Sequence, residues 1–246
     1  MTSVEHSRDR LLVALDVDSG ARALELATAL RGTAGGFKIG LRLFTLEGPA
    51  LVSRLVDAGA RVFLDLKFHD IPNTVSQAVE AAVATGAWMI NVHASGGAAM
   101  MQAAAGAAAE AAARMGRQRP LVIGVTVLTS IDEPTLRTTG VDRPLLQQVL
   151  ALSRMAQTAG LDGVVASPLE ANAVQNACGP DFVIVSPGIR GASAGGVKGD
   201  QARTMGPREA AEAGATYIVV GRPILAAADP VAAAAAIVEE LVARPR

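Results

Sequence analysis

Residues 57–66 read Asp-Ala-Gly-Ala-Arg-Val-Phe-Leu-Asp-Leu, and this segment joins the end of a helix to the start of a strand. Its Gly59 suits the left-handed backbone conformation that commonly follows the last turn of a helix. The run Arg61–Leu66 is rich in apolar residues, as strands buried on both faces of a parallel sheet are. The segment therefore predicts a helix that is followed at once by a buried strand.

The same helix-to-strand junction recurs around Gly86, Gly160 and Gly214. Eight short runs rich in Val, Ile and Leu are predicted as strands: Leu11–Leu15, Gly36–Gly40, Arg61–Leu66, Ala87–Val92, Leu121–Val127, Asp162–Ala166, Phe182–Val185 and Thr216–Val220. The stretches between them are rich in Ala, which favours helix, and are predicted as helices: Gly20–Leu30, Pro49–Asp57, Asn73–Ala84, Gly97–Met115, Pro144–Thr158, Leu169–Ala177, Pro207–Ala213 and Pro230–Leu241.

A strand–helix unit of about 25–30 residues that occurs eight times predicts the α/β class and, within it, a (β/α)8 TIM barrel. A doubly wound open sheet is the alternative, because the number of strands does not by itself close a barrel. No linker interrupts the pattern, so residues 11–246 are predicted to form a single catalytic domain. Residues 1–10 are polar and are expected to form a disordered or loosely ordered tail.

Composition excludes several classes of protein. The formal net charge is −1 and aromatic residues make up 3% of the chain, so neither a basic surface nor stacking platforms for nucleic acid are expected. No apolar run approaches the roughly 20 residues that a membrane helix needs, and no signal peptide is visible in the first ten residues. The single cysteine, Cys178, fits a reducing compartment, so we expect a cytoplasmic protein.

Lysine is scarce in this chain: the 22 basic residues include only Lys38, Lys67 and Lys198, the other 19 being arginines. A lysine can shift its pKa and release a proton, whereas arginine keeps its proton in practice. Lys38 and Lys67 stand near the ends of predicted strands, which is where barrels of this kind carry their functional groups. We interpret these two lysines as functional. The alternative is that they are solvent-exposed surface residues that are lysine and not arginine by chance.

Acidic residues alternate with the two lysines. Asp65 and Lys67 are two positions apart, so a regular strand would point both side chains to the same side. Asp70 follows three residues later, and Asp16 stands just beyond the first predicted strand. Such a cluster is either a buried structural ion-pair network or an active site. The three histidines and the cysteine lack the spacing of metal ligands, so no metal is predicted.

Phosphate-binding features follow the last two predicted strands. Gly221-Arg222 comes directly after the eighth strand, and Arg190 opens a glycine-rich tract, 191–199, after the seventh. The loops after these two strands form the usual phosphate site of a TIM barrel, where backbone N–H groups and an arginine bind the anion. The tract 191–199 is also long enough to act as a lid over a ligand.

The segment Asp65-Leu-Lys-Phe-His-Asp-Ile-Pro-Asn-Thr74 resembles the signature of the orotidine 5′-phosphate decarboxylases, in their bacterial form. Further motifs of that family occur in the same order between Leu11 and Leu241: Leu15–Val17, Phe37–Gly40, Asn91–Ala94, Thr126–Ser130, Pro187–Arg190, Asp200-Gln201 and Gly221–Ile224. The resemblance implies a cofactor-free enzyme that converts orotidine 5′-monophosphate to uridine 5′-monophosphate and CO2 in pyrimidine biosynthesis. It further implies a homodimer whose active sites are shared between subunits.

The resemblance also implies a role for each matching residue. The residues implied in catalysis are Lys67 as the proton donor, together with Asp65, Asp70 and Lys38. The residues implied in substrate binding are Asp16 and Lys38 at the ribose, Asp65 beside the substrate carboxylate, Lys67 at C6, Thr129 at the pyrimidine, Arg190, Gln201, Gly221 and Arg222 at the phosphate, and Asp70, Ile71 and Thr74 across the dimer interface.

Two other functions fit part of the pattern. Sugar-phosphate decarboxylases or synthases of the same barrel superfamily share an Asp-x-Lys at the third strand but require Mg²⁺; the continuation His69–Thr74 and the pair Thr129-Ser130 distinguish this chain from them. A non-catalytic barrel that binds a nucleotide phosphate is the second alternative. The retention of Asp65, Lys67 and Asp70 argues against it.

Overall fold

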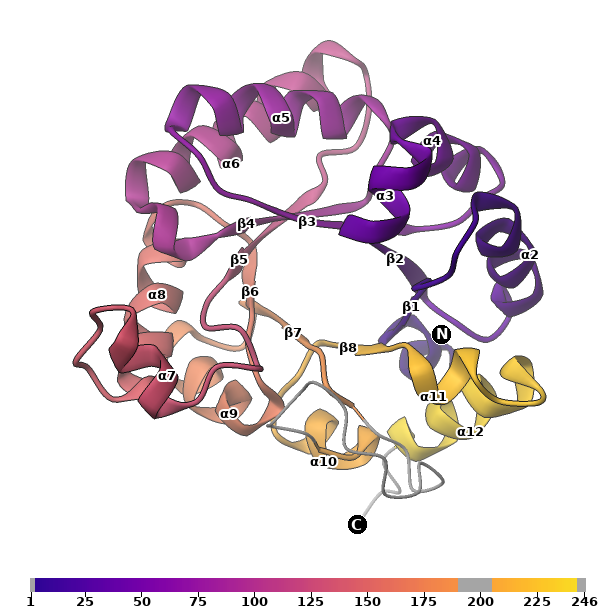
Figure 1. Ribbon diagram of the computed structural model, residues 1–246. Helices are drawn as coiled ribbons and strands as arrows, with labels where there is room; N and C mark the ends of the chain where they lie inside the picture. The colour runs from indigo at the N-terminus through magenta and orange to yellow at the C-terminus, as the bar shows by residue number, and fades with distance from the viewer. Residues whose placement is uncertain (1–2, 190–204, 243–246) are drawn as a thin grey trace.

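The structure is a computed structural model that describes residues 3–189 and 205–242. Eight parallel strands pair in chain order, and β8 pairs back with β1 to close a barrel (Figure 1). The strands are β1 Leu11–Ala14, β2 Gly36–Gly40, β3 Val62–Phe68, β4 Met89–His93, β5 Leu121–Val125, β6 Gly163–Val165, β7 Val183–Ser186 and β8 Tyr217–Val220. The predicted (β/α)8 barrel is confirmed, and the open sheet is excluded.

Helices form a ring outside the strands (Figure 1). All eight predicted helices are present, with ends that differ from the prediction by a residue at most: α2 Gly20–Leu30, α4 Pro49–Asp57, α5 Pro72–Ala84, α6 Ala98–Arg114, α8 Leu145–Thr158, α9 Pro168–Cys178, α10 Pro207–Glu212 and α12 Pro230–Leu241. Sequence analysis missed the shorter ones: α1 Ser3–Asp9, α3 Leu41–Glu47, α7 Glu133–Thr138, α11 Arg222–Leu225 and the 3-10 turn η1 Ala94–Gly96. These have too few turns for an apolar period to stand out.

The segment 1–10, which we expected to form a disordered or loosely ordered tail, contains a short helix in the structure. Helix α1 occupies residues 3–9 and packs against α12 near the N-terminus (Figure 1). The Arg10 guanidinium donates to the carbonyl oxygens of Ala215 and Thr216, at 2.7 and 3.4 Å, just before β8. These contacts across the β1–β8 seam hold the segment, and they come from residues far away in the chain that a local pattern does not reveal.

The barrel interior is apolar at its centre and ends in an aromatic floor. Side chains of Leu12, Ala14, Phe63, Met89, Ile123, Val185 and Val219 fill the centre. At the floor, the rings of Trp88 and Tyr217 meet edge to face, with centroids 5.3 Å apart, and the Arg61 guanidinium lies 3.8 Å from the Trp88 ring centroid. Because the lower interior is filled, only the end where the strands finish is open to a ligand.

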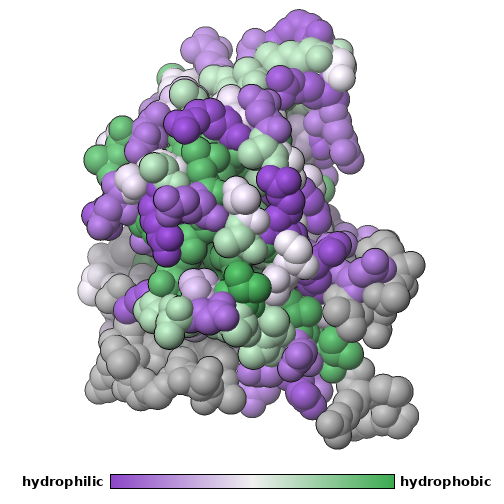
Figure 2. All heavy atoms as spheres, turned by 90° about the vertical axis from the view of Figure 1, so that its right-hand side faces the viewer, coloured by the Kyte–Doolittle hydropathy of each residue, from purple (hydrophilic) through white to green (hydrophobic). Residues whose placement is uncertain are grey.

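The outer surface of the helical ring is mixed in character. Figure 2 shows one side of the molecule, where hydrophilic residues dominate and apolar residues form small patches between them. Within the described part of the chain, no helix is long and apolar enough to cross a membrane.

A pair of glycine substitutions tests the tightness of the barrel. A Cβ added at Gly163 of β6 would overlap the backbone carbonyl of Val183 in the neighbouring strand β7, whereas one added at Gly106 on the exposed side of α6 would meet no atom within 4 Å. We expect Gly163→Ala to lower the free energy of unfolding by about 3 kcal/mol. Gly106→Ala, the control, should raise it by up to about 1 kcal/mol.

Urea denaturation followed by fluorescence of the single tryptophan, Trp88, measures both effects. Equal stability of the two variants would contradict the close packing of β6 against β7.

Candidate active site

The open end of the barrel brings most of the predicted site residues to one rim. Lys38 lies on β2, Asp65 and Lys67 lie on β3, and Asp16 follows β1 by two residues. The strands are parallel and pair in chain order, so these ends are neighbours. Two predicted phosphate ligands, Arg190 and Gln201, and the predicted lid over 191–199 lie outside the described residues.

The charged groups form a chain of alternating sign. Lys67 Nζ lies 2.6 Å from Asp65 Oδ1, and Lys38 Nζ lies 3.4 Å from Asp65 Oδ2. Lys38 Nζ also lies 3.5 Å from Asp16 Oδ1. The Asp65 side chain is 12% exposed and that of Asp16 is 63% exposed. This series of charged groups therefore extends from the barrel interior out to the rim. Each carboxylate oxygen of Asp65 thus faces its own ammonium group.

Asp65 is held in its ionised form. Burial alone would raise its pKa, but the charges of Lys38 and Lys67 act in the opposite direction, as do hydrogen bonds from Lys67 and Asn91. The sum of these effects holds the pKa of Asp65 below its usual value. A permanent negative charge therefore sits between two ammonium groups at the mouth of the barrel.

The pairing of Lys67 with Asp65 has a different cause from the one that the sequence predicted. The β3–β4 register runs from Leu64 opposite Ile90 to Phe68 opposite Val92, so β3 bulges between these positions. Lys67 sits in the bulge with φ 52°, in the left-handed region that non-glycine residues rarely adopt. Its side chain reaches Asp65 through this turn of the backbone and not through regular strand alternation.

Asn91 on β4 is a site residue that sequence reasoning did not assign. Its side chain is fully buried, accepts a hydrogen bond from the Lys67 backbone N–H at 2.8 Å and donates one to Asp65 Oδ1 at 2.7 Å. The available signal was a polar residue inside the apolar run Met89–Val92. A buried amide of this kind needs partners, and here both partners belong to the charge chain.

Two histidines stand beside the charge chain. The rings of His69 and His93 have centroids 5.4 Å apart and are tilted by 43°. Burial lowers the pKa of His93, the charges of His69 and Lys67 lower it further, and Asp65 opposes them. His93 is therefore mainly neutral at pH 7 and adds no positive charge to the cluster.

The predicted residues Asp70, Ile71 and Thr74 do not join the charge chain within the subunit. All three are exposed, Ile71 to 67%, and they lie where β3 passes into α5. Asp70 Oδ1 accepts a hydrogen bond from the Ile71 backbone N–H at 2.7 Å and makes no ion pair with any residue that the structure describes. These side chains are thus accessible to a second molecule.

The predicted pyrimidine and phosphate residues lie at other points of the same end. Thr129 is buried in the turn that follows β5. Gly221 and Arg222 follow β8 directly, and a Cβ at Gly221 would lie 3.6 Å from Asp16 Oδ2. The exits of β8 and β1 are therefore adjacent, with Arg222 exposed next to them.

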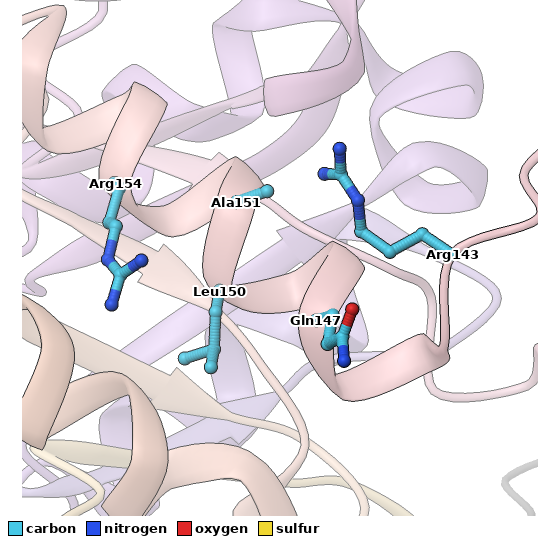
Figure 3. Close-up of a pocket in the computed structure, with 5 residues that line it drawn as sticks. All are labelled: Arg143, Gln147, Leu150, Ala151 and Arg154. Atoms are coloured by element: carbon cyan, nitrogen blue, oxygen red, sulfur yellow. The ribbon is translucent and has the colours of Figure 1, made fainter.

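The rest of the described structure offers no competing site with the predicted residues. Among residues 3–189 and 205–242, no three His, Cys, Asp or Glu side chains converge on a possible metal position. A surface pocket of about 330 Å³ lies on the helical ring, lined by residues on or just before α8 that include Arg143 and Arg154 (Figure 3). It contains none of the predicted site residues, so the barrel mouth remains the candidate site.

Comparison with known proteins identifies close relatives. The model of the orotidine 5′-phosphate decarboxylase / HUMPS family matches residues 9–237. The chain is 54% identical to the orotidine 5′-phosphate decarboxylase of Moorella thermoacetica, over 96% of this chain and 93% of that protein. It is 53% identical to the protein of that name from Syntrophotalea carbinolica, over 96% of each.

Solved structures agree with this result. The crystal structure of orotidine 5′-phosphate decarboxylase from Lactobacillus acidophilus matches with a TM-score of 0.83 and 38% identity, over 95% of this chain and 99% of that one. The enzyme of the same name from Pyrococcus horikoshii OT3 matches with a TM-score of 0.75 and 25% identity, over 95% of this chain and all of that one.

The lowered pKa of Asp65 predicts how stability depends on pH. The ionised carboxylate stabilises the fold fully above the unfolded-state pKa of about 3.9, and that contribution is lost as the pH falls through the lower folded-state pKa. Asp65→Asn removes this titration. The free energy of unfolding of the wild type minus that of Asp65→Asn should be constant above about pH 5 and should fall below about pH 4.

Urea titrations at several pH values measure this difference. A difference that stays constant down to pH 3 would contradict the ionised, doubly paired state of Asp65.

Proposed function

The chain belongs to the orotidine 5′-phosphate decarboxylase / HUMPS family, and we propose that it converts orotidine 5′-monophosphate to uridine 5′-monophosphate and CO2. The observation that carries this proposal is the pair of ammonium groups on Asp65, which lies at the start of the segment 65–74. Full-length relatives with about half of their residues identical bear the name of this activity.

The reaction needs a fixed positive charge close to one carbon atom. When the bond between C6 and the carboxyl carbon breaks, the electron pair stays on C6, where the pyrimidine ring delocalises it poorly. In our proposal the Lys67 ammonium lies beside C6, and its charge stabilises the developing carbanion without rearrangement of solvent. Lys67 Nζ then gives a proton to C6 and regains one from water, which balances the reaction. Arginine would supply the charge but no proton.

Asp65 has two roles in this proposal. It holds the ammonium groups of Lys67 and Lys38 on opposite oxygens, which keeps Lys67 in place before the substrate arrives. It also lies beside the substrate carboxylate, and repulsion between the two negative charges is relieved as neutral CO2 departs. Its lowered pKa supports both roles, because each requires the ionised form.

The remaining residues bind the parts of the substrate that do not react. We assign the ribose hydroxyls to Asp16 and Lys38, the pyrimidine to Thr129, and the phosphate to Arg190, Gln201, Gly221 and Arg222. The proximity of Gly221 to Asp16 supports neighbouring phosphate and ribose positions. Binding energy from the distant phosphate helps to order the reacting groups.

We propose that the enzyme is a cytoplasmic homodimer with shared active sites. Asp70, Ile71 and Thr74 would enter the partner's site, Asp70 next to Lys67. The exposure of all three residues and the absence of an ion pair for Asp70 among the described residues support this arrangement. The single cysteine of the chain supports a reducing compartment.

Purified protein should decarboxylate orotidine 5′-monophosphate in the presence of EDTA, because the proposed mechanism uses no metal ion. Loss of ultraviolet absorbance at the orotate band measures the reaction. Activity that EDTA abolishes and Mg²⁺ restores would contradict the mechanism and favour a metal-dependent sugar-phosphate enzyme. Binding of the nucleotide without turnover would indicate a non-catalytic barrel.

The shared site predicts complementation between two inactive variants, Lys67→Ala and Asp70→Ala. After subunits re-pair at random, about half of the dimers are mixed, and in each of these one site has Lys67 together with the partner's Asp70. Activity should therefore recover to roughly a quarter of the wild-type value. If Asp70 acts within its own subunit, every site stays damaged, and no recovery follows even when subunit exchange is demonstrated.

A further inference from the structure

The left-handed conformation of Lys67 is unusual for its residue type. Lys67 is the one non-glycine residue with positive φ among residues 3–189 and 205–242. A lysine in this conformation is strained, and such strain persists only where neighbouring groups enforce it. The bulge removes the regular β3–β4 backbone pairing at this point, so an acceptor other than the strand ladder has to satisfy the Lys67 backbone N–H.

Asn91 supplies that acceptor. It stands on β4 between Ile90 and Val92, the two residues at which the β3–β4 pairing breaks off and resumes. Its Oδ1 accepts from the Lys67 N–H at 2.8 Å, in the place that a ladder hydrogen bond would take. The side chain is fully buried, so water cannot take over this bond.

The other end of the same amide fixes Asp65. Asn91 Nδ2 donates to Asp65 Oδ1 at 2.7 Å, and Lys67 Nζ contacts the same oxygen at 2.6 Å. The second oxygen is left to Lys38. The chemistry of the two neighbours sets the orientation of the amide, because a backbone N–H requires an acceptor and a carboxylate requires a donor.

We propose that Asn91 is a positioning residue for the decarboxylation: it sets the backbone turn that presents Lys67 and the rotation of the Asp65 carboxylate. This inference rests on the proposed function. Asparagine offers a donor and an acceptor in this geometry without a charge or a titratable proton. An ionised aspartate would face Asp65 with a second carboxylate, leucine would offer neither bond, and glutamine would be too long for a closed core.

The test compares Asn91→Leu, which has a similar volume and offers neither hydrogen bond, with the smaller Asn91→Ser, which provides a second variant if the first does not fold. Ser153→Ala is the matched control, because Ser153 is equally buried but donates to Val149 O within α8. We expect kcat to fall by about 100-fold in both Asn91 variants, as for a displacement of reacting groups by about 1 Å. Binding of uridine 5′-monophosphate should change by less than about threefold, because the phosphate and ribose contacts remain.

A kcat within about threefold of the wild-type value, or a loss of nucleotide binding in parallel with kcat, would overturn the proposal. Ser153→Ala should change neither quantity.

Hydrogen exchange of the wild-type protein tests the geometry without reference to activity. The Lys67 amide proton should exchange as slowly as amides of the barrel core, because its acceptor is a buried side chain. Fast exchange at Lys67 would overturn the assignment of Asn91. Slow exchange in a protein that does not decarboxylate the nucleotide would leave the contact standing and reject the proposed function instead.

Discussion

The buried carboxylate of Asp65 is the group around which the barrel mouth is organised. A charge in this position is costly unless it is paired and hydrogen-bonded, and its partners come from three consecutive strands: Lys38 on β2, Lys67 on β3 and Asn91 on β4. No one of these strands provides the site alone. Closure of the sheet in the correct register is what turns three separate stretches of sequence into one cluster.

Along the barrel axis, the residues that form the apolar core lie apart from the polar residues of the candidate site. Apolar side chains fill the centre, and the pair Trp88 and Tyr217 closes the floor, so the interior below the mouth serves the core. The polar residues Asp65 and Asn91 follow Phe63 and Met89 of the apolar centre along β3 and β4, and so lie nearer the mouth. A substitution at the mouth therefore changes the candidate site and leaves most of the buried apolar area in place.

Sequence reasoning succeeded where the signal is local and failed where it is not. The strands and the longer helices follow from apolar runs and glycine junctions, and the clustering of Lys38, Asp65 and Lys67 follows from the fact that parallel strands end at one rim. Helices α3 and α11 begin directly at strand exits and carry no apolar period of their own. The bulge at Lys67 involves Asn91 from the neighbouring strand, and a pattern within β3 alone does not reveal that contact.

The departures from local rules gather at the candidate active site. A lysine occupies a left-handed position inside a strand, an asparagine is fully buried in an apolar run, and a carboxylate with little exposure keeps its charge. Each departure is unfavourable alone, and together they satisfy one another: the amide accepts from the strained backbone and donates to the carboxylate, which in turn holds both ammonium groups. A regular strand would leave Lys67 without this support. The strained backbone of Lys67 thus accompanies an ammonium group that is held beside Asp65 before the substrate binds. An electrostatic mechanism requires a positive charge that is fixed in advance in this way.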